Sequence, residues 1–548
     1  MTVPADRPTA TYLPHARIAL HERHGEWPCE SLTSALARRL SETPERVLYV
    51  AGAERITAPV LADRVARLAR GLRDLGVGSG DVVSWQMPNW FEGVVLTFAL
   101  DRLGAISNPI LPIYREREVG FVLRQAKTRM LIVAGEVRGF DHRVLAQNLR
   151  AESPALRHVA VLRAAPAAGQ LAFEGLSAGA PDDAPPTPPG PHDVATLFYT
   201  SGTTSDPKGV LHTPSTLGAF LRTQFDAAGR NRDSVGILWF PLTHIGGICA
   251  FGMNPVVYGT RAVFLEQFDP DAALDLIERE QVTSAGGPTP IIQALLAAKT
   301  FSPERVRSVR NAGLGATDVP PELMREVRGK LGAFVSRSYG MTECPMSTAG
   351  APEDPDDKLV GTDGRAVPGV EIRIVDDAGR PVAAGVEGEI ELFGPQLCVG
   401  YLDARLSQEA FTADGYLRSG DLAVKDEGGF VRITGRKKDI IIRKGENLSA
   451  KSIEDELYDH PKVADVAVIG VADRQSGERV CACVVLRPDV ETMTLAELRA
   501  FMSGRHVMQQ KIPEQIEIVA ELPRNATGKV KKFELRARFA EAAPGRLV

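Results

Sequence analysis

A run of small hydroxylated residues around one lysine is the segment best suited to chemistry. Residues 199–210 read Tyr-Thr-Ser-Gly-Thr-Thr-Ser-Asp-Pro-Lys-Gly-Val and follow an apolar stretch at 194–198. Hydroxyls and backbone N–H groups gathered where a strand ends can cradle phosphate oxygens, and Lys208 adds a mobile cation. The spacing is not that of a Walker loop, because Pro207 stands where the second glycine is required. We therefore expect a phosphate-binding loop of another kind rather than a plain polar turn.

Two further positions suggest a reaction at a nucleotide. Asp421 follows Ser-Gly, and a carboxylate in such a turn can accept two hydrogen bonds from a ribose diol. Lys529 follows Gly528 near the C-terminal end. An ammonium on such a loop can stabilise negative charge that gathers at a phosphorus centre. Taken alone, Asp421 would more often be a turn cap, and Lys529 would more often be a solvent-facing charge.

The order of the motifs along the chain gives these residues a common context. The segments resemble those of the adenylate-forming (ANL) superfamily, and the chain is identified as a member similar to acyl-CoA synthetases, the AMP-dependent acid:CoA ligases. The resemblance covers nearly the whole chain. It is carried by residues 199–210, PLTHIGG at 241–247, YGMTE at 339–343, GEIELFGPQLCVGYL at 388–402, YLRSGDLA at 416–423, GRKKDIIIRKGEN at 435–447 and LPRNATGKVKK at 522–532.

The resemblance implies a set of nucleotide-binding and catalytic residues. Tyr339 would present a flat face to adenine, Glu343 would hold Mg²⁺, and Lys529, His244 and Glu343 would be the catalytic residues. ATP and CoA would be substrates, together with a small carboxylic acid. The implied nucleotide-binding residues are Thr200, Ser201, Gly202, Thr203, Thr204, Lys208, Gly315, Ala316, Thr317, Tyr339, Gly340, Thr342, Asp421 and Arg436.

The same resemblance assigns a hinge, a CoA side and an acyl pocket. Lys438 occupies the hinge position, and His244 and Gly445 lie on the side where the CoA thiol enters. His244 taken alone would more often be a core histidine. The acyl pocket would be lined by Gly286, Gly287, Gly313 and Met341. Small residues there leave room for a bulky or alicyclic acid, but glycines also serve backbone geometry, and both interpretations stay open.

Departures from the family pattern keep other functions open. Ser205 stands where the phosphate loop usually has glycine, Asp318 adds a carboxylate beside the adenine segment, and Ala450 and Ser452 replace a proline and a glutamate after the hinge. The alternatives are a ligase that mainly makes the thioester from a supplied acyl adenylate, a ligase that loads a carrier protein, a luciferase-like oxygenase, and a nucleotide-binding protein without catalysis.

The elements that must position these residues alternate between strands and helices. Strands are expected at 81–87 and 129–135 and helices at 90–104 and 116–126, a rhythm typical of helix-covered parallel sheets. A second set comprises strands at 236–242 and 281–287 and helices at 271–280 and 290–298, whereas the Pro-rich stretch 164–192 is expected to be a linker.

The length of the chain requires more than one domain. Single cores stop growing near about 250–300 residues, and the chain has 548. We predict an α/β fold with a large N-terminal domain at 1–435 and a small, mobile α+β domain at 436–548, joined by the hinge.

Composition excludes several classes of protein. With 64 basic and 69 acidic residues the formal charge is −5, and no basic stripe points to nucleic acid. The six cysteines lack metal or redox spacing, which favours reduced core residues in a cytoplasmic protein. The uncharged segment 234–260 is interrupted by glycines and prolines, so we expect buried pieces rather than a membrane span. A monomer or homodimer is expected.

Overall fold

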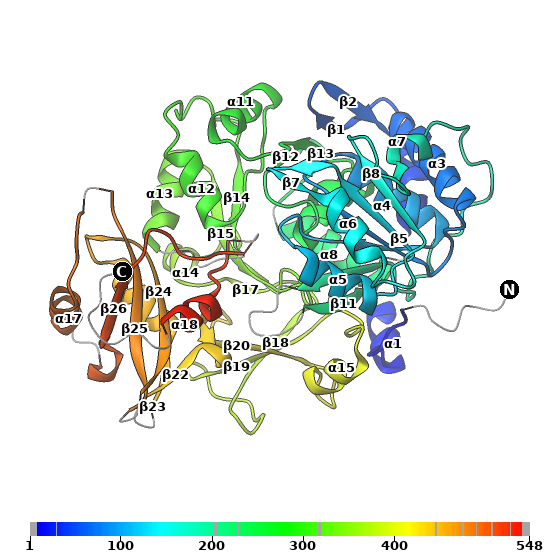
Figure 1. Cartoon of the computed structure of the whole chain (residues 1–548). Coiled ribbons are helices and arrows are strands. Elements are labelled where there is room, and N and C mark those ends of the chain that lie inside the picture. Colours follow the sequence, from blue (N-terminus) through cyan, green and yellow to red (C-terminus); the bar gives the residue numbers. More distant parts are fainter. Residues whose placement is uncertain are drawn as a thin grey trace.

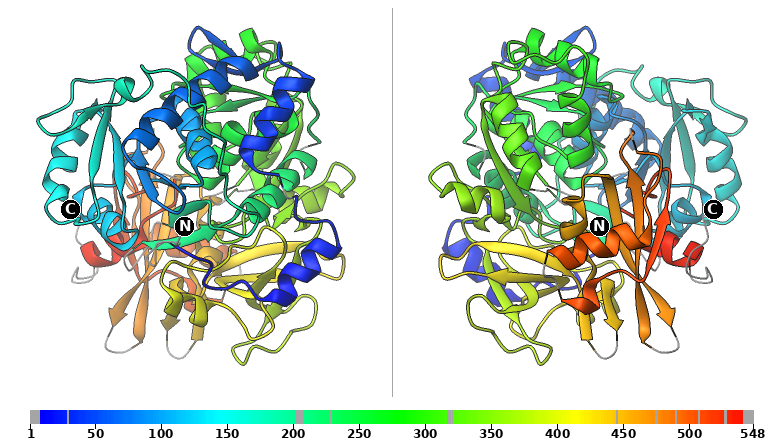
Figure 2. Two further views of the ribbon diagram at one scale, coloured as in Figure 1. Left: turned by 90° about the vertical axis from the view of Figure 1, so that its right-hand side faces the viewer. Right: turned by 90° about the vertical axis from the view of Figure 1, so that its left-hand side faces the viewer.

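The computed structural model places a large N-terminal lobe beside a smaller C-terminal one (Figure 1). It describes residues 8–28, 30–200, 207–227, 229–315, 319, 321–443, 446–473, 476–488, 490–505, 508–525 and 528–539. In Figure 2 the orange and red C-terminal lobe lies against the yellow sheet of the large lobe in both views. The predicted α/β class, with a large and a small lobe, is confirmed.

Two sheets with mostly parallel pairing form the centre of the large lobe. The seven-stranded sheet has the order β11(Lys208–His212), β10(Thr196–Thr200), β4(Ile106–Pro109), β3(Val82–Gln86), β5(Met130–Ala134), β8(His158–Leu162), β9(Leu171–Ala172). The second has the order β12(Val235–Leu238), β13(Arg261–Phe264), β1(Val47–Ala51), β2(Glu54–Thr57). Parallel bridges through Ser284 connect β12 to β14(Asn311–Leu314). The latter opens the sheet β14, β15(Phe334–Tyr339), β16(Thr348–Ala349), β17(Arg365–Ala366).

Helices cover these sheets, and the main core lies between them. Apolar side chains of α3(Ala58–Asp74), α4(Glu92–Leu103) and a π-helix at Ile248–Met253 pack with β1, β3 and β5 in one buried cluster. The remaining helices of the lobe are α1(His15–Arg23), α2(Leu32–Glu42), α5(Glu116–Gln125), α6(His142–Arg150), α7(Phe173–Leu176), α8(Pro214–Ala227), α9(Ile245–Gly247), α10(Asn254–Tyr258), α11(Pro270–Glu280), α12(Thr289–Leu296), α13(Pro321–Leu331), α14(Asp356–Gly361) and α15(Ala404–Ala410).

An antiparallel sheet connects the large lobe to the C-terminal one. Its order is β18(Glu371–Val375), β19(Glu387–Phe393), β20(Leu417–Lys425), β21(Val431–Arg436), and a 3₁₀ turn at Lys437–Asp439 follows it. The C-terminal sheet has the order β23(Glu446–Ser449), β22(Ile440–Arg443), β25(Gly477–Leu486), β24(Val463–Asp473), with β26(Gln515–Ile518) also on β25. Its helices are α16(Ala450–Tyr458), α17(Leu495–Gly504) and α18(Lys532–Phe539), with a 3₁₀ turn at Gln509–Lys511. In the large lobe, β6(Glu136–Val137) and β7(Phe140–Asp141) form a separate small hairpin.

Most expected elements form close to their expected bounds. The helix expected at 90–104 ends at Gly104, whose φ of 68° is the left-handed conformation that glycine adopts most readily. The strand expected at 281–287 is wrong in extent, because only isolated bridges form at Ser284 and Gly287. The stretch 164–192 is not wholly a linker: β9 pairs with β8, and Phe173 of α7 is buried in the main core.

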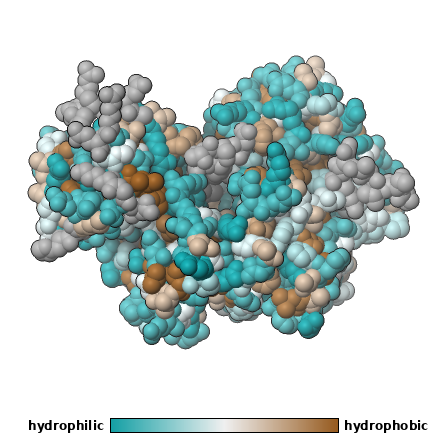
Figure 3. All heavy atoms as spheres, turned by 90° about the horizontal axis from the view of Figure 1, so that it is seen from below, coloured by the Kyte–Doolittle hydropathy of each residue, from teal (hydrophilic) through white to brown (hydrophobic). Residues whose placement is uncertain are grey.

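The uncharged segment 234–260 folds into short buried pieces, β12, α9, the π-helix and α10. Within the part of the chain that the structure describes, no helix is both long and apolar enough to cross a membrane. Seen from below, the surface is mostly hydrophilic with small hydrophobic patches (Figure 3). The five described cysteines are free and buried, as expected, and Cys29 lies outside the described residues.

Candidate active site

The carboxyl ends of parallel strands bring the predicted site residues to one edge of the large lobe. β14 and β15 run parallel, so Gly315 follows one strand and Tyr339 ends the next. β12 runs parallel to the same set through Ser284, and His244 lies in the loop beyond it. Ligands of open α/β sheets bind at such ends. Residues far apart in the sequence are thereby gathered in one place.

Asp421 is the centre of a buried polar cluster beside this edge. β20 and β21 pair Asp421 with Arg436, whose Nε lies 2.7 Å from Asp421 Oδ1. The Tyr339 hydroxyl donates to Asp421 Oδ2 at 2.7 Å, and burial together with this carboxylate raises the pKa of Tyr339. Each carboxylate oxygen has two acceptor positions, so Asp421 can still accept hydrogen bonds from a diol.

Glu343 follows the turn that Gly340 opens, and its carboxylate is buried. A Cβ on Gly340 would lie 2.3 Å from the backbone nitrogen of Met346, so this turn requires glycine. Tyr401 donates its hydroxyl to Glu343 Oε1 at 2.8 Å. Burial raises the pKa of Glu343, whereas that hydrogen bond and the charges of Lys208 and Arg436 oppose the rise.

The donor set fits one hard cation held partly by phosphate. Among the described residues, no group of three or more His, Cys, Asp or Glu side chains gathers at metal-ligand spacing. Mg²⁺ commonly uses one or two carboxylates and takes its other ligands from substrate phosphates and water. Glu343 lies within the electrostatic reach of Lys208, the lysine beside the predicted phosphate loop, and therefore suits that arrangement.

Lys529 reaches the same cluster from the C-terminal lobe. Its backbone N–H donates to Asn525 Oδ1 at 2.9 Å, which closes the loop that carries it. Burial, and then the positive charge of Arg436, lower the pKa of Lys529 from 10.5 to about 8, against the opposing charges of Asp421 and Glu343. An ammonium of the small lobe thus lies in the field of the carboxylates of the large one.

His244 is the N-cap residue of α9, and the positive charge of Lys529 acts on its imidazole ring. The backbone N–H of Gly246 donates to its Nδ1 at 3.2 Å, which leaves Nε2 as the protonated nitrogen of the neutral ring. Burial and the charge of Lys529 lower the pKa of His244 to about 4, so the imidazole is neutral at pH 7. His244 and Lys529, two of the three predicted catalytic residues, therefore come from different lobes.

Lys438, the residue predicted as the hinge, lies between the two lobes. Lys438 is in the 3₁₀ turn after β21, and burial and Arg436 lower its pKa. Lys437, beside it, pairs with Glu389 of the large lobe at 2.8 Å. Asp439, on the other side, pairs with Arg536 of α18 at 2.8 Å. The residues on either side of Lys438 are therefore bound to different lobes.

The glycines of the predicted acyl pocket differ in their surroundings. A Cβ on Gly286 would lie 2.4 Å from the carbonyl oxygen of Gly313, and one on Gly287 would lie 2.9 Å from Trp239 Nε1. Both glycines therefore serve close packing. Gly313 has nothing within 4 Å of its Cβ position, so of these three glycines it is the one that borders open space. Met341 packs at the edge of the core under the antiparallel sheet.

Several predicted residues are placed by backbone contacts or lie outside the described residues. Thr200 ends β10 opposite Lys208, and the carbonyl oxygen of Thr342 lies 2.9 Å from Nε2 of the buried His212. The predicted residues outside the described part of the chain are Ser201, Gly202, Thr203, Thr204, Ala316, Thr317 and Gly445.

Sequence reasoning missed Tyr401 and Arg17. Tyr401 lies in the family-like segment 388–402, but its residue type alone indicates no role. Arg17 of α1 is buried and donates to the carbonyls of Cys398, at 2.8 Å, and of Leu397. The backbone N–H of Cys398 donates in turn to the carbonyl of Glu343 at 2.7 Å. Nothing in the sequence around Arg17 indicates this contact, which spans almost four hundred residues.

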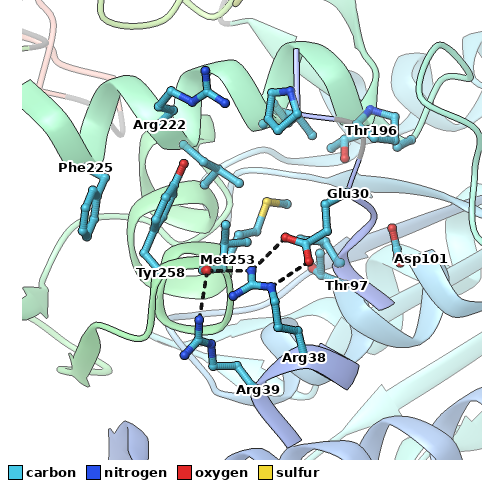
Figure 4. A pocket seen from close by; sticks show the side chains of 18 of the residues that line it. Glu30, Arg38, Arg39, Thr97, Asp101, Thr196, Arg222, Phe225, Met253 and Tyr258 are labelled. Atoms are coloured by element: carbon cyan, nitrogen blue, oxygen red, sulfur yellow. Dashed lines mark hydrogen bonds and ion pairs between the residues drawn. The ribbon is translucent and has the colours of Figure 1, made fainter. Parts of the chain in front are cut away.

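A cavity of about 570 Å³ lies elsewhere, between α2, α4, α8 and α10 (Figure 4). Several of its polar side chains already have partners in the protein: Arg38 pairs with Glu30 at 2.8 Å, and Arg39 donates to the carbonyl of Val256 at 2.9 Å. Phe225 and Tyr258 stack on one side, with ring centroids 4.3 Å apart. The predicted site residues that the structure describes do not line this cavity, so we place the chemistry at the strand ends.

Comparison with known proteins agrees with this geometry. A family model described as AMP-binding enzyme matches residues 36–402, and one described as AMP-binding enzyme C-terminal domain matches residues 452–529. The chain belongs to the AMP-binding enzyme family. The predicted membership of the adenylate-forming superfamily, and with it the class of AMP-forming acid–thiol ligases, is confirmed.

Two members of this family show its range of acids. The chain is 34% identical over 524 residues to a medium-chain fatty-acid–CoA ligase of Escherichia coli (strain K12), covering 95% of this chain and 92% of that protein. It is also 34% identical over 536 residues to a 2-hydroxy-7-methoxy-5-methyl-1-naphthoate–CoA ligase of Streptomyces carzinostaticus, covering 94% of each.

The solved structures include one related enzyme in two states. ATP-bound MatB from Rhodopseudomonas palustris is 29% identical, with a TM-score of 0.85 over 94% of this chain and 99% of that one. Apo MatB, with the same identity and coverage, gives a TM-score of 0.73. The structure of the present chain is therefore closer to ATP-bound MatB than to apo MatB.

Proposed function

We propose that the chain is an acid:CoA ligase that forms an acyl adenylate from ATP and a carboxylic acid and transfers the acyl group to CoA. The observation that carries this proposal is that Lys529 of the small lobe lies in the field of Asp421, Glu343 and Arg436. A carboxylate that attacks the α-phosphorus brings two anions together, and an ammonium at that point stabilises the crowded centre.

The first step forms one bond and breaks another. The acid carboxylate oxygen bonds to the α-phosphorus while the bond to the pyrophosphate oxygen breaks, giving acyl-AMP and pyrophosphate. Asp421 would orient the ribose, and Lys208 and Lys529 would balance the phosphate charge. Glu343 would hold Mg²⁺, which when bound neutralises part of the charge on the polyphosphate.

In the second step the thiol of CoA would lose its proton to solvent, its sulfur would bond to the acyl carbon, and the bond from that carbon to the AMP oxygen would break, so that AMP leaves. The neutral ring of His244 suits this side of the site, because it adds no positive charge to compete with Lys529 for the phosphate. We propose that residues 436–548 rotate about Lys438 between the steps and withdraw Lys529. The greater likeness to the ATP-bound than to the apo form of MatB supports assigning the present arrangement to the first step.

The acid is proposed to be bulky or alicyclic. The open space at Gly313 and a relative named for a naphthoate support a wide pocket. A carrier protein as acceptor, or a supplied acyl adenylate as substrate, is tested in the same experiment.

The experiment is ATP–pyrophosphate exchange over a panel of aliphatic, alicyclic and aryl acids, followed by mass spectrometry of the products formed with CoA. We expect acid-dependent exchange and an acyl-CoA with release of AMP. A thioester formed from supplied acyl adenylate without exchange for any acid would instead support the specialised ligase. Acylation of a holo carrier protein without CoA turnover would overturn CoA as the acceptor.

A further inference from the structure

One tyrosine contacts both the carboxylate proposed to hold the metal and the lysine proposed to hold phosphate. The hydroxyl of Tyr401 donates to Glu343 Oε1 at 2.8 Å. The Nζ atom of Lys208 lies over the same ring, 5.3 Å from its centroid. These groups come from three separate segments of the chain, and Tyr401 is only 3% exposed.

The backbone of Tyr401 is held by contacts with β11, with Ser407 and with Thr11. An antiparallel bridge joins it to Val210 of β11, and the N–H of Leu402 donates to the carbonyl of Gly209 at 2.7 Å. Its own N–H donates to Ser407 Oγ at 2.8 Å, and its carbonyl accepts from Thr11 Oγ1 at 2.7 Å. The backbone from which the ring projects is therefore held by contacts with three other segments of the chain.

The residue before it shows how tightly this turn is packed. Gly400 has a φ of 104°, in the region that favours glycine, and a Cβ there would lie 2.1 Å from Thr11 Oγ1. The same backbone that pairs with β11 thus directs the phenol toward Glu343. Lys208 is the first residue of β11. The pairing of Tyr401 with β11 therefore positions the ring near Lys208 as well as the hydroxyl near Glu343.

We propose that Tyr401 is a positioning residue that orients Glu343 toward a divalent cation through its hydroxyl and holds Lys208 toward the polyphosphate through its ring. By engaging one acceptor position of Oε1, the hydroxyl orients the carboxylate and leaves other acceptor positions for the cation. Partners that orient a ligand carboxylate are typically worth about 10- to 100-fold in metal affinity. The ring face attracts an ammonium and limits the directions that the lysine can take. This inference rests on the proposed function only in assuming that metal and ATP bind together.

Two substitutions separate the two contacts. Tyr401→Phe removes the hydroxyl and keeps the ring, whereas Tyr401→Leu removes both. The readout is binding rather than turnover: Mn²⁺ affinity of the enzyme–ATP complex by electron paramagnetic resonance, and ATP affinity without metal by calorimetry. We expect Tyr401→Phe to weaken Mn²⁺ about tenfold and leave metal-free ATP affinity unchanged. Tyr401→Leu should weaken both.

The matched control is Tyr416→Phe, because Tyr416 also donates to a carboxylate, Glu371 Oε2 at 2.6 Å, but on an exposed part of the large lobe. It should leave Mn²⁺ affinity at the wild-type value. In a Glu343→Gln background, Tyr401→Phe should have no further effect on Mn²⁺ affinity. A purely structural role would instead lower affinity equally in both backgrounds.

Mn²⁺ affinity of Tyr401→Phe within twofold of wild type overturns the proposal. If that variant does not fold, Ser407→Ala decides, because it keeps the phenol and removes the hydroxyl that the backbone N–H of Tyr401 and the Thr11 hydroxyl contact, each at 2.8 Å, and it should still weaken Mn²⁺; unchanged affinity there also overturns the proposal. These measurements use no acid and no CoA. Failure of the proposed ligase activity would therefore appear in the acid panel and not here.

Discussion

The charge state of Lys529 makes the first half-reaction sensitive to pH in a direction that can be worked out. In the empty site its pKa is lowered to about 8 by burial and by Arg436. The reaction requires the ammonium, so activity is present below this pKa and lost above it. With a pKa of about 8, about 90% of the enzyme carries the charge at pH 7 and about 10% at pH 9.

The expected result is a fall of roughly tenfold in kcat/KM for adenylation between pH 7 and pH 9, because kcat/KM reports the free enzyme. Bound ATP adds negative charge beside the amine and so raises its pKa. The fall in kcat should therefore occur at a higher pH than the fall in kcat/KM. The assay is acyl-AMP formation without CoA, which removes ionisation of the thiol from the profile. The concentration of the magnesium–ATP complex is held constant at every pH.

Lys529→Arg provides the control. A guanidinium stays protonated throughout this range, so the variant should lose the alkaline limb whatever its absolute rate. If Lys529→Arg kept the same fall between pH 7 and pH 9, another group would be responsible. The electrostatic role assigned to Lys529 would then be refuted.

Three further predictions follow from contacts of the described residues. Asp421→Asn should raise the KM for ATP about 10- to 100-fold, because a charged acceptor for the ribose is lost; an unchanged KM in initial-rate assays contradicts its role. Arg17→Met should lower the free energy of unfolding by about 2–4 kcal/mol, since buried carbonyls lose their donors, and thermal unfolding at the wild-type temperature would refute this. Gly313→Val should reduce kcat/KM for bulky acids more than for small ones, whereas Gly286→Val, whose side chain would meet backbone, should lower stability instead. Equal losses for all acids in Gly313→Val would contradict the open pocket.

The sequence predicted the fold well where periodicity was strong and short in range. α4 and α5 and the strands β3 and β5 lie within about two residues of their expected bounds, because apolar spacing and Gly104 set them locally. The strand expected at 281–287 does not form as a continuous ladder. Gly286 and Gly287 instead allow close packing against Gly313 and Trp239. The π-helix at Ile248–Met253 has no simple pattern in the sequence.

The candidate site was predictable only as a list of residues. Motif order identified Asp421, Glu343 and Lys529, but not that Arg436 and Tyr339 would both bind the carboxylate of Asp421. Such contacts depend on strand register and on the arrangement of the lobes, which no local pattern encodes. Arg17 shows the extreme case, because a residue of α1 holds carbonyls of the segment that positions Glu343.

The central claim is that one ammonium from the small lobe serves the first half-reaction and is withdrawn for the second. The most direct measurement compares the two half-reactions in Lys529→Ala. We predict that acyl-AMP formation falls by several orders of magnitude, while thioester formation from supplied acyl adenylate and CoA stays near the wild-type rate. Adenylation at a near-normal rate, or an equal loss in both steps, would contradict the account.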